Sequence, residues 1–311
     1  GLTAYNTTLK TLSLYDGAAW DTVVTENSGG SRFVDLTTQQ SISGEKTFTS
    51  GLKVDGTIDL NAPGSSVFIG RGAGVNDGGT TSENVGVGFN ALYFNTSGAR
   101  NSAVGWQALF SNTSGNANVA NGVKALRENT TGGNNTANGS QALLNNTTGG
   151  NNTANGANAL LNNTAGGNNT ANGYGALSAN TTGYNNTANG YGALNNNTTG
   201  LYNVANGSFA LSKNTIGSYN IGAGDGAGNY ISTGTSVANT NPRFSVFLGH
   251  ETKSKTAADT NQIVIGSNAV GEGSNTARIG DADVTALYVG GNGAGVVLNS
   301  PNGTAYKITV S

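Results

Sequence analysis

The chain has 311 residues and a formal net charge of −2, and only 10% of its residues are charged, with 50 Gly and no Cys. Typical soluble domains carry about 25% charged residues and about 7% Gly, so the composition argues against an ordinary globular protein. The absence of Cys excludes disulfides and thiolate metal sites. The sequence has no basic cluster that would support nucleic-acid binding and no run near the ~18 apolar residues of a membrane span, so we expect neither kind of partner.

Residues 1–62 predict a β-rich N-terminal connector domain that contains a hairpin. Residues 12–15 and 18–24 are strand-like, and Asp16-Gly17 between them suits a type I′ turn. Residues 52–60 alternate like a further strand, and residues 61–64 indicate a linker.

Residues 63–228 contain a 17-residue unit nine times, the last incomplete, with the frame Asn-x-Ala-x-Gly-x-x-Ala-Leu-x-x-Asn-Thr-x-Gly. A unit this short cannot bury a core alone, so neighbouring units must stack and equivalent residues must form ladders along one axis. Pro is absent from residues 64–241, as a closely hydrogen-bonded ladder requires. We therefore predict an all-β fold, a parallel β-roll or β-solenoid with one coil per unit. The first Gly of the frame falls at Gly88, Gly105, Gly122, Gly139, Gly156, Gly173, Gly190, Gly207 and Gly224.

Each unit is predicted to contain one short strand, such as residues 118–122, in which Val119 and Asn121 share a face. That face carries Val or Ile in the end units and Thr with Asn in the middle units. Because apolar residues occupy the same face, we expect it to point inward, toward a trimer axis or the coil interior, and its amides to form a hydrogen-bonded ladder. A wet axial channel and an exposed column that binds glycan or ice are the alternatives. The expected inward column is Asn121, Asn138, Asn155, Asn172, Asn189 and Asn206.

The Ala-Leu pair of each unit is predicted to pack in the core, and Asn-Thr-x-Gly to turn the chain with its Gly at positive φ. The pair buries too little apolar surface to offset the ordering of 17 residues at ~1–2 kcal/mol each. We therefore expect an obligate homotrimer, with the copies intertwined or side by side.

Tyr residues are concentrated in the later repeats. Aromatic faces stack on sugar rings, so a glycan platform is one interpretation, and stacking of the rings on each other or the covering of an edge is the other. The candidate glycan contacts are Tyr174, Tyr184, Tyr191 and Tyr202.

The last part of the chain departs from the strict period. Residues 229–283 contain strand–Gly units at looser spacing, and residues 284–311 predict a C-terminal β-hairpin around Pro301-Asn302-Gly303.

The sequence offers few components for catalysis or cofactor binding. No nucleophile–base pair is apparent, and Gly-rich patterns fall within the repeat frame, where turn glycines explain them. Asp225, Asp281 and Asp283 are too sparse for the six or more oxygens of a Ca²⁺ site, and His250 is the only His. We therefore expect no catalytic residue, metal or cofactor, and a surface position for His250, unless a trimer axis brings three copies together.

The strand–Gly units at residues 101–105 and 262–266 resemble the head repeats of trimeric autotransporter adhesins. The resemblance covers residues 66–283 and implies a homotrimeric, left-handed parallel β-roll. The period of 17 is longer than that of the adhesin repeat, and Asn replaces the usual inner aliphatic residue in six units.

The flanking segments at residues 14–20, 40–48 and 298–304 resemble phrases of bacteriophage tail fibres. Residues 245–291 are similar to segments that precede a C-terminal intramolecular chaperone, which in that family often cleaves itself off after a Ser; this chain ends at Ser311 and begins at Gly1 without Met. The expectation is a piece of a longer polypeptide. The resemblance implies a non-enzymatic, extracellular virion protein whose partners are copies of itself, other tail proteins, and a host polysaccharide or outer-surface protein.

Two other functions fit the same pattern. A bacterial trimeric surface adhesin would share the repeat architecture, and an ice-binding solenoid would use the Thr columns.

Overall fold

A computed structural model describes residues 66–78, 82–232 and 237–284 of the chain, together with the short strands named below. The chain divides into two units, Gly1–Asp59 and Leu60–Ser311. Residues 40–48 and 52–60, on which two of the sequence interpretations fall, lie outside the described residues.

The first unit contains a four-stranded antiparallel sheet in the order β1-β2-β3-β4. Strands β2 and β3 pair with Tyr15 opposite Trp20, which confirms the hairpin predicted around Asp16-Gly17. Its strands are β1 (Thr3–Asn6), β2 (Thr11–Tyr15), β3 (Trp20–Glu26) and β4 (Arg32–Phe33). Near the C-terminus, β18 (Val296–Asn299) and β19 (Ala305–Ile308) pair antiparallel, as expected for a hairpin there.

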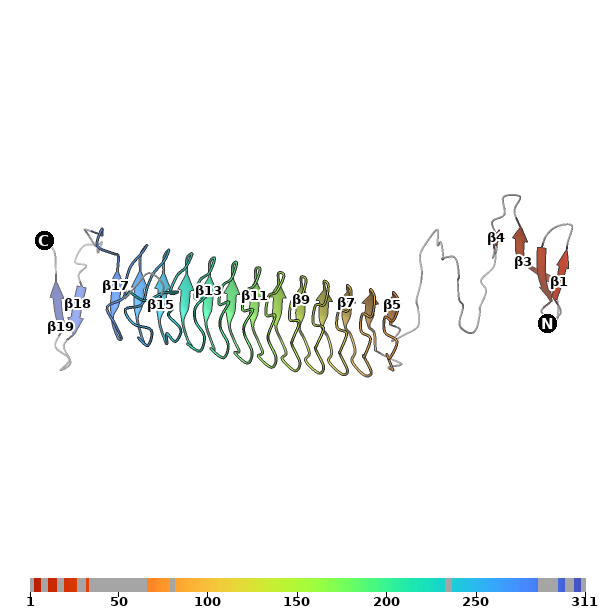
Figure 1. The fold of residues 1–311 in the computed structure, drawn as a ribbon, viewed down its shortest axis with the longest axis horizontal. Helices are drawn as coiled ribbons and strands as arrows, with labels where there is room; N and C mark the ends of the chain where they lie inside the picture. Colours follow the sequence, from red (N-terminus) through yellow and green to blue (C-terminus); the bar gives the residue numbers. More distant parts are fainter. Residues whose placement is uncertain are drawn as a thin grey trace. The chain divides into compact units, whose positions relative to one another are not determined.

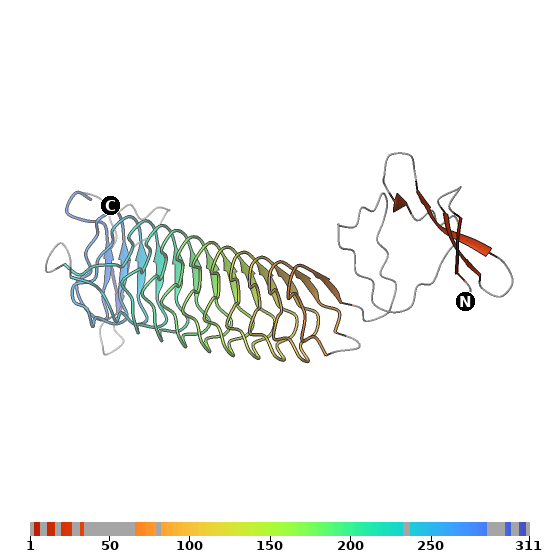
Figure 2. The ribbon, with the colours of Figure 1, turned by 45° about the vertical axis from the view of Figure 1, so that its right-hand side comes forward.

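Residues 66–284 are built around a single 13-stranded parallel sheet, in which each strand pairs with the next along the chain. Figures 1 and 2 show these strands side by side along the stack, one per coil. The fold is thus the predicted β-solenoid. At about 4.8 Å per strand, the twelve steps from β5 to β17 correspond to about 58 Å. The strands are β5 (Val67–Ile69), β6 (Val85–Val87), β7 (Ser102–Val104), β8 (Val119–Asn121), β9 (Thr136–Asn138), β10 (Thr153–Asn155), β11 (Thr170–Asn172), β12 (Thr187–Asn189), β13 (Val204–Asn206), β14 (Ile221–Ala223), β15 (Val246–Leu248), β16 (Ile263–Ile265) and β17 (Ala277–Ile279).

The pairing register follows the 17-residue period, so that equivalent residues of successive coils lie next to each other. Ala154 pairs with Ala171, 17 residues on. The period changes after β14, where Ile221 pairs with Val246, 25 residues on. The longer coil does not interrupt the sheet, and the looser repeats of residues 229–283 continue the same stack.

The core consists of the middle residue of each strand and the Ala-Leu pair that follows it. In the middle coils all three are fully buried, as Ala154, Ala159 and Leu160 illustrate. The coils of β5 and β15 place a Phe in the strand, and Gly in the preceding or following coil accommodates it: Phe68 pairs with Gly86 and Phe247 with Gly222.

Two columns of fully buried Asn run inside the solenoid, and we name them by their place in the coil. The strand ladder consists of the first Asn of each repeat, and the turn ladder consists of the Asn directly before the Thr of the repeat frame. In both, an amide Nδ2 donates to the Oδ1 of the preceding coil, as from Asn163 to Asn146 at 2.7 Å. The strand ladder is Asn84, Asn101, Asn118, Asn135, Asn152, Asn169, Asn186, Asn203 and Asn220; the turn ladder is Asn95, Asn112, Asn129, Asn146, Asn163, Asn180, Asn197 and Asn214.

Both ladders point their donors toward the N-terminal end of the stack, where one carboxylate receives them. Asp77 Oδ1 accepts from Asn95 Nδ2 at 2.7 Å and from Asn84 Nδ2 at 3.3 Å. A charged acceptor strengthens these hydrogen bonds, so Asp77 is a cap for both ladders.

Two glycines of each repeat are required for different reasons. Gly156, a first frame Gly, has φ +138°, and a Cβ there would lie 2.6 Å from Gly173 O. The turn Gly is not left-handed, so the expected positive φ is wrong for it. At Gly149 a Cβ would lie 2.5 Å from Asn146 Oδ1, and crowding at the turn ladder is the reason for Gly. The left-handed residue comes two positions later, as at Asn151 with φ 58°.

Candidate functional site

The Asn column predicted to face inward lies on the outer face of the sheet. Its members Asn121, Asn138, Asn155, Asn172, Asn189 and Asn206 are half-buried or exposed. A coil-interior position is therefore wrong for this column. Side chains alternate along a strand, and the buried middle Ala forces the residues on either side of it outward. An orientation toward a trimer axis stays a prediction.

The outward column does form the expected hydrogen-bonded ladder. Asn138 Nδ2 donates to Asn155 Oδ1 at 2.9 Å, and the pattern continues through Asn172 and Asn189 to Asn206 at 2.7–2.8 Å. The two inward ladders were not identified as such from the sequence. Their signal was invariance: Asn occupies the first frame position in all nine units, whereas the outward column changes to Val or Ala at its ends.

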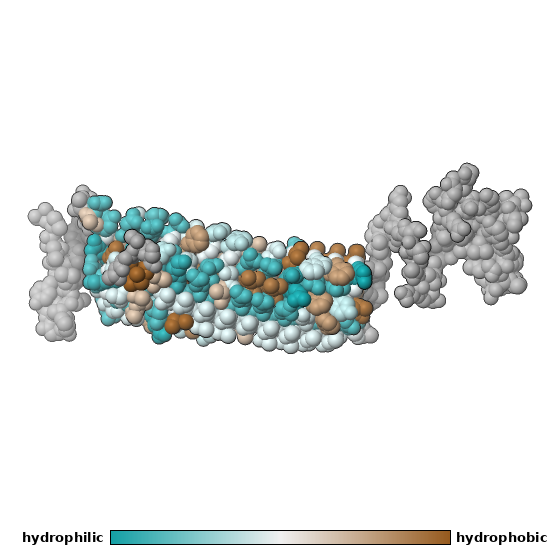
Figure 3. Space-filling model, in the orientation of Figure 1, coloured by the Kyte–Doolittle hydropathy of each residue, from teal (hydrophilic) through white to brown (hydrophobic). Residues whose placement is uncertain are grey.

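The outer sheet face is apolar near both ends of the stack. Its exposed aliphatic residues leave 38–60% of their surface free; they are Ile69, Val85, Val104, Val119, Ile221, Ile263 and Ile279. Between them, Thr136, Thr153, Thr170 and Thr187 occupy the equivalent column in register. On the face drawn in Figure 3, hydrophobic residues form separate brown patches among hydrophilic and neutral ones.

The four predicted Tyr contacts separate into two aromatic columns. In the first, Tyr174 and Tyr191 stack with ring centroids 5.4 Å apart, and Phe209 meets Tyr191 edge to face at 5.0 Å. Sequence reasoning did not include Phe209, because it stands one position later in the repeat than the two Tyr.

The second column contains Tyr184, Tyr202, Tyr219 and Phe244. Tyr184 meets Tyr202 edge to face at 5.5 Å, and Tyr202, Tyr219 and Phe244 stack at 4.9 and 5.0 Å. Tyr219 follows Tyr202 by 17 residues, so the repeat period places them in one column. Phe244 follows only after the longer coil, so the period does not reveal that it belongs to the same column. Neighbouring rings stack on one another in this column, and its four residues stay 40–58% exposed.

The second column also holds aromatic residues in an unfavourable backbone conformation. Tyr202, Tyr219 and Phe244 have φ values of 53°, 62° and 51°. Other coils place Asn at this position, a residue that tolerates the left-handed region far better than a bulky aromatic residue does. The aromatic side chains therefore stand where local backbone preference opposes them.

His250 and the acidic residues considered as metal ligands, Asp225, Asp281 and Asp283, lie on the surface of the described part of the stack. His250 Nε2 lies 3.7 Å from Asp225 Oδ2, and both side chains are more than half exposed, as expected for a surface His. Asp281 Oδ1 accepts a hydrogen bond from the Asp283 backbone. Within the described ranges no three His, Cys, Asp or Glu side chains gather where they could hold an ion.

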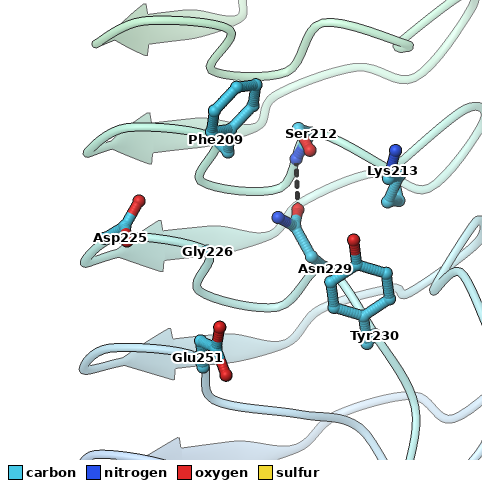
Figure 4. Close-up of a pocket in the computed structure, with 8 residues that line it drawn as sticks. All are labelled: Phe209, Ser212, Lys213, Asp225, Gly226, Asn229, Tyr230 and Glu251. Carbon is cyan, nitrogen blue, oxygen red and sulfur yellow. Dashed lines mark hydrogen bonds between the residues drawn. The ribbon is translucent and has the colours of Figure 1, made fainter. Parts of the chain in front are cut away.

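A hollow of about 260 Å³ opens on the surface where the first aromatic column ends (Figure 4). Phe209, Gly226 and Glu251 occupy equivalent positions in three successive coils, and the missing side chain of Gly226 leaves the gap between the other two. The lining residues are Phe209, Ser212, Lys213, Asp225, Gly226, Asn229, Tyr230 and Glu251.

Asn229 supplies a side-chain amide to this hollow. The residue is only 3% exposed, and its Oδ1 accepts a hydrogen bond from the Ser212 backbone at 2.6 Å. Its Nδ2 has no hydrogen-bond partner among the described residues, and a Cβ placed on Gly226 would lie 3.9 Å from it. Figure 4 shows this nitrogen directed away from Ser212, toward Asp225 and Gly226.

No protein family model matches the chain, and no curated protein or solved structure shows detectable similarity to it. The described residues also contain no helix of the length and hydrophobicity needed to cross a membrane.

Proposed function

We propose that the chain is a non-enzymatic structural segment of an extracellular fibre, with a bacteriophage tail fibre as the first candidate. One observation carries the proposal: a continuous parallel sheet of 13 strands, reinforced from within by two Asn ladders. Such a stack is stiff, and its first and last strands lie twelve strand spacings apart. This suits a shaft or a receptor-binding head. A bacterial adhesin head would use the same architecture.

The outer sheet face is the proposed surface for self-association into a homotrimer. Exposed aliphatic residues at both ends would gain stability on burial, at about 25 cal/mol per Å² of apolar surface. The Asn and Thr columns between them would complete a polar middle section. The number of three copies rests on the resemblance to trimeric adhesin heads.

Sedimentation equilibrium of paired variants tests this proposal. Val119→Arg with Ile221→Arg places two charges on the sheet face, at residues that are 40% and 42% exposed. The control, Val123→Arg with Ile216→Arg, makes the same changes outside the sheet, at residues 47% and 46% exposed. We expect a trimer for the wild type and the control, and monomer for the sheet-face variant. A monomeric wild type, or equal behaviour of both variants, would refute self-association through this face.

The proposed role at the host surface is attachment to cell-surface polysaccharide or an outer-surface protein. The two aromatic columns and the Asn- and Thr-rich surface support it, because many weak contacts repeated over three copies raise the overall affinity. Other tail proteins would join the fibre to the virion.

The regular Thr column favours a second candidate, an ice-binding solenoid. Thr136, Thr153, Thr170 and Thr187 are in register on one sheet face, at about 4.8 Å spacing. Thermal hysteresis measured in a nanolitre osmometer tests it, with Thr153→Lys plus Thr170→Lys as the variant. Hysteresis in the wild type that the variant lacks would favour ice binding over the fibre role.

A further inference from the structure

We propose that the hollow between Phe209 and Glu251 binds one neutral pyranose residue of a glycan. The inference rests on the proposed attachment function and assigns it to one site. It differs from the expectation of a Tyr platform, because the aromatic residues of the hollow are Phe209 and Tyr230 and none of the four predicted Tyr.

The first argument is the shape of the hollow. Pockets for drug-sized ligands span about 300–1,000 Å³, so about 260 Å³ suits a single small unit rather than an extended ligand. The hollow spans three coils, and its floor is the backbone around Gly226. Phe209 is the last ring of the first aromatic column, and the Gly in the next coil leaves its far side uncovered by another ring. Tyr230 supplies a second aromatic wall.

The second argument is the set of hydrogen-bonding groups. Asn229 Nδ2 and the Lys213 ammonium are donors, while the carboxylates of Asp225 and Glu251 are acceptors. A sugar hydroxyl both donates and accepts, so a polyol can use all of these groups together. The Nδ2 of Asn229 is the most informative of them, because the Ser212 backbone holds its Oδ1 and so fixes the amide with this donor open to a ligand.

The third argument is the local charge. One ammonium and two carboxylates line the hollow, so a sulfate, phosphate or carboxylated sugar would meet a net negative site. The preceding repeats, residues 129–212, have no charged residue, so Lys213, Asp225 and Glu251 are local features of this site and not part of the repeat frame. An apolar ring face beside acceptors and donors matches a neutral pyranose, which has both an apolar face and hydroxyl edges.

The test fills the hollow with a side chain that other coils already carry. Asn occupies the position of Gly226 in two earlier coils, at Asn90 and Asn158, with φ values of 55° and 59°. Gly226 has φ +63°, so Gly226→Asn places a side chain beside Asn229 in a backbone conformation that Asn already adopts in those coils. The matched control is Gly175→Asn, the same substitution at the same repeat position with φ +65°.

Binding of the full chain to an array of neutral, amino and acidic glycans is measured for the wild type and both variants. Far-UV circular dichroism, thermal melting and sedimentation confirm that all three fold and associate alike. We expect the wild type and Gly175→Asn to bind the same neutral glycans, and Gly226→Asn to bind them about tenfold or more weakly.

Equal binding by both variants, an equal loss in both, binding only to acidic or amino glycans, or no binding by the wild type would overturn the proposal. Sedimentation of the wild type reports on the fibre proposal separately. A trimer that binds no neutral glycan would refute this site and leave the structural role standing.

Discussion

Removal of one amide from the turn ladder should destabilise the solenoid strongly. Asn163 Nδ2 donates to Asn146 Oδ1 at 2.7 Å and to Gly166 O at 2.9 Å, and Asn163 Oδ1 accepts from Asn180 Nδ2 at 2.8 Å. In Asn163→Ala, Asn146 Oδ1 loses its only donor among the described residues, and one hydrogen of Asn180 Nδ2 loses its acceptor. Each buried unpaired group costs ~1–3 kcal/mol, so the free energy of unfolding should fall by about 2–6 kcal/mol.

The adjacent residue provides a control with identical chemistry. Asn162 is exposed, and its Oδ1 accepts a hydrogen bond from Asn145 Nδ2 at 3.0 Å. Because water replaces that contact readily, Asn162→Ala should change stability by no more than about 0.5 kcal/mol. The comparison isolates burial in the ladder from the general effect of losing an Asn.

Urea unfolding followed by far-UV circular dichroism measures both variants, and hydrogen exchange with peptide resolution locates the damage. In a linear stack each coil is stabilised by its neighbours, so exchange should accelerate most in the coils on either side of Asn163. Equal midpoints for the two variants, or an even rise in exchange along the whole stack, would refute the role assigned to the ladder.

Three further outcomes are expected. Gly156→Ala should cost about 1–3 kcal/mol, because its φ of +138° is unfavourable for Ala and its Cβ would meet Gly173 O at 2.6 Å; a urea midpoint equal to that of the wild type would contradict this. Asp77→Ala should remove the charged acceptor of Asn95 Nδ2 and accelerate hydrogen exchange in residues 84–98 but not in the middle coils; uniform protection would show that the ladders need no cap. Asn172→Asp should dissociate the proposed trimer at pH 7, because three carboxylates would meet at the axis; an intact trimer in sedimentation equilibrium would place the outward column away from the interface.

The period of the repeat was enough to predict the parallel stack, because a 17-residue unit with one Ala-Leu pair has no other way to bury a core. Which face of the strand points to the core was not predictable in the same way. Side chains alternate along a strand, so one set faces the core and the other faces outward. Val119 and Asn121 form one set and the single Ala between them forms the other, and the larger pair resembled core residues more closely. The narrow interior explains the reverse choice: Leu and two Asn already fill each coil. Where the strand carries Phe247, the neighbouring coil has Gly222, at which even a Cβ would lie 2.7 Å from Leu211 Cγ.

The candidate binding site was less accessible to sequence analysis, since it depends on departures from the repeat. Phe209 and Gly226 stand at equivalent positions in consecutive coils, and the frame marks neither as special. The sequence does not show that Asn229 Nδ2 is free, because this follows only from the hydrogen bond between its Oδ1 and the Ser212 backbone. Tyr174 and Tyr191 were identified from the sequence because aromatic rings are conspicuous there, but their stacking on each other is a tertiary fact.

A strictly repetitive stack has a limitation as a recognition surface, and the hollow offers a way around it. Each regular coil presents nearly the same side chains as its neighbours, and the ladder amides donate and accept within the stack, so their hydrogen-bonding capacity is largely used internally. A ligand that bound one regular coil would bind the next, about 4.8 Å away, equally well, and no single site would be defined. Selective binding therefore requires a coil that differs. The coil of Gly226 and Asn229 is the longer coil after β14, and it follows the return of charge at Lys213. The same coil that interrupts the period thus contributes the open floor, the spare donor and one of the two carboxylates.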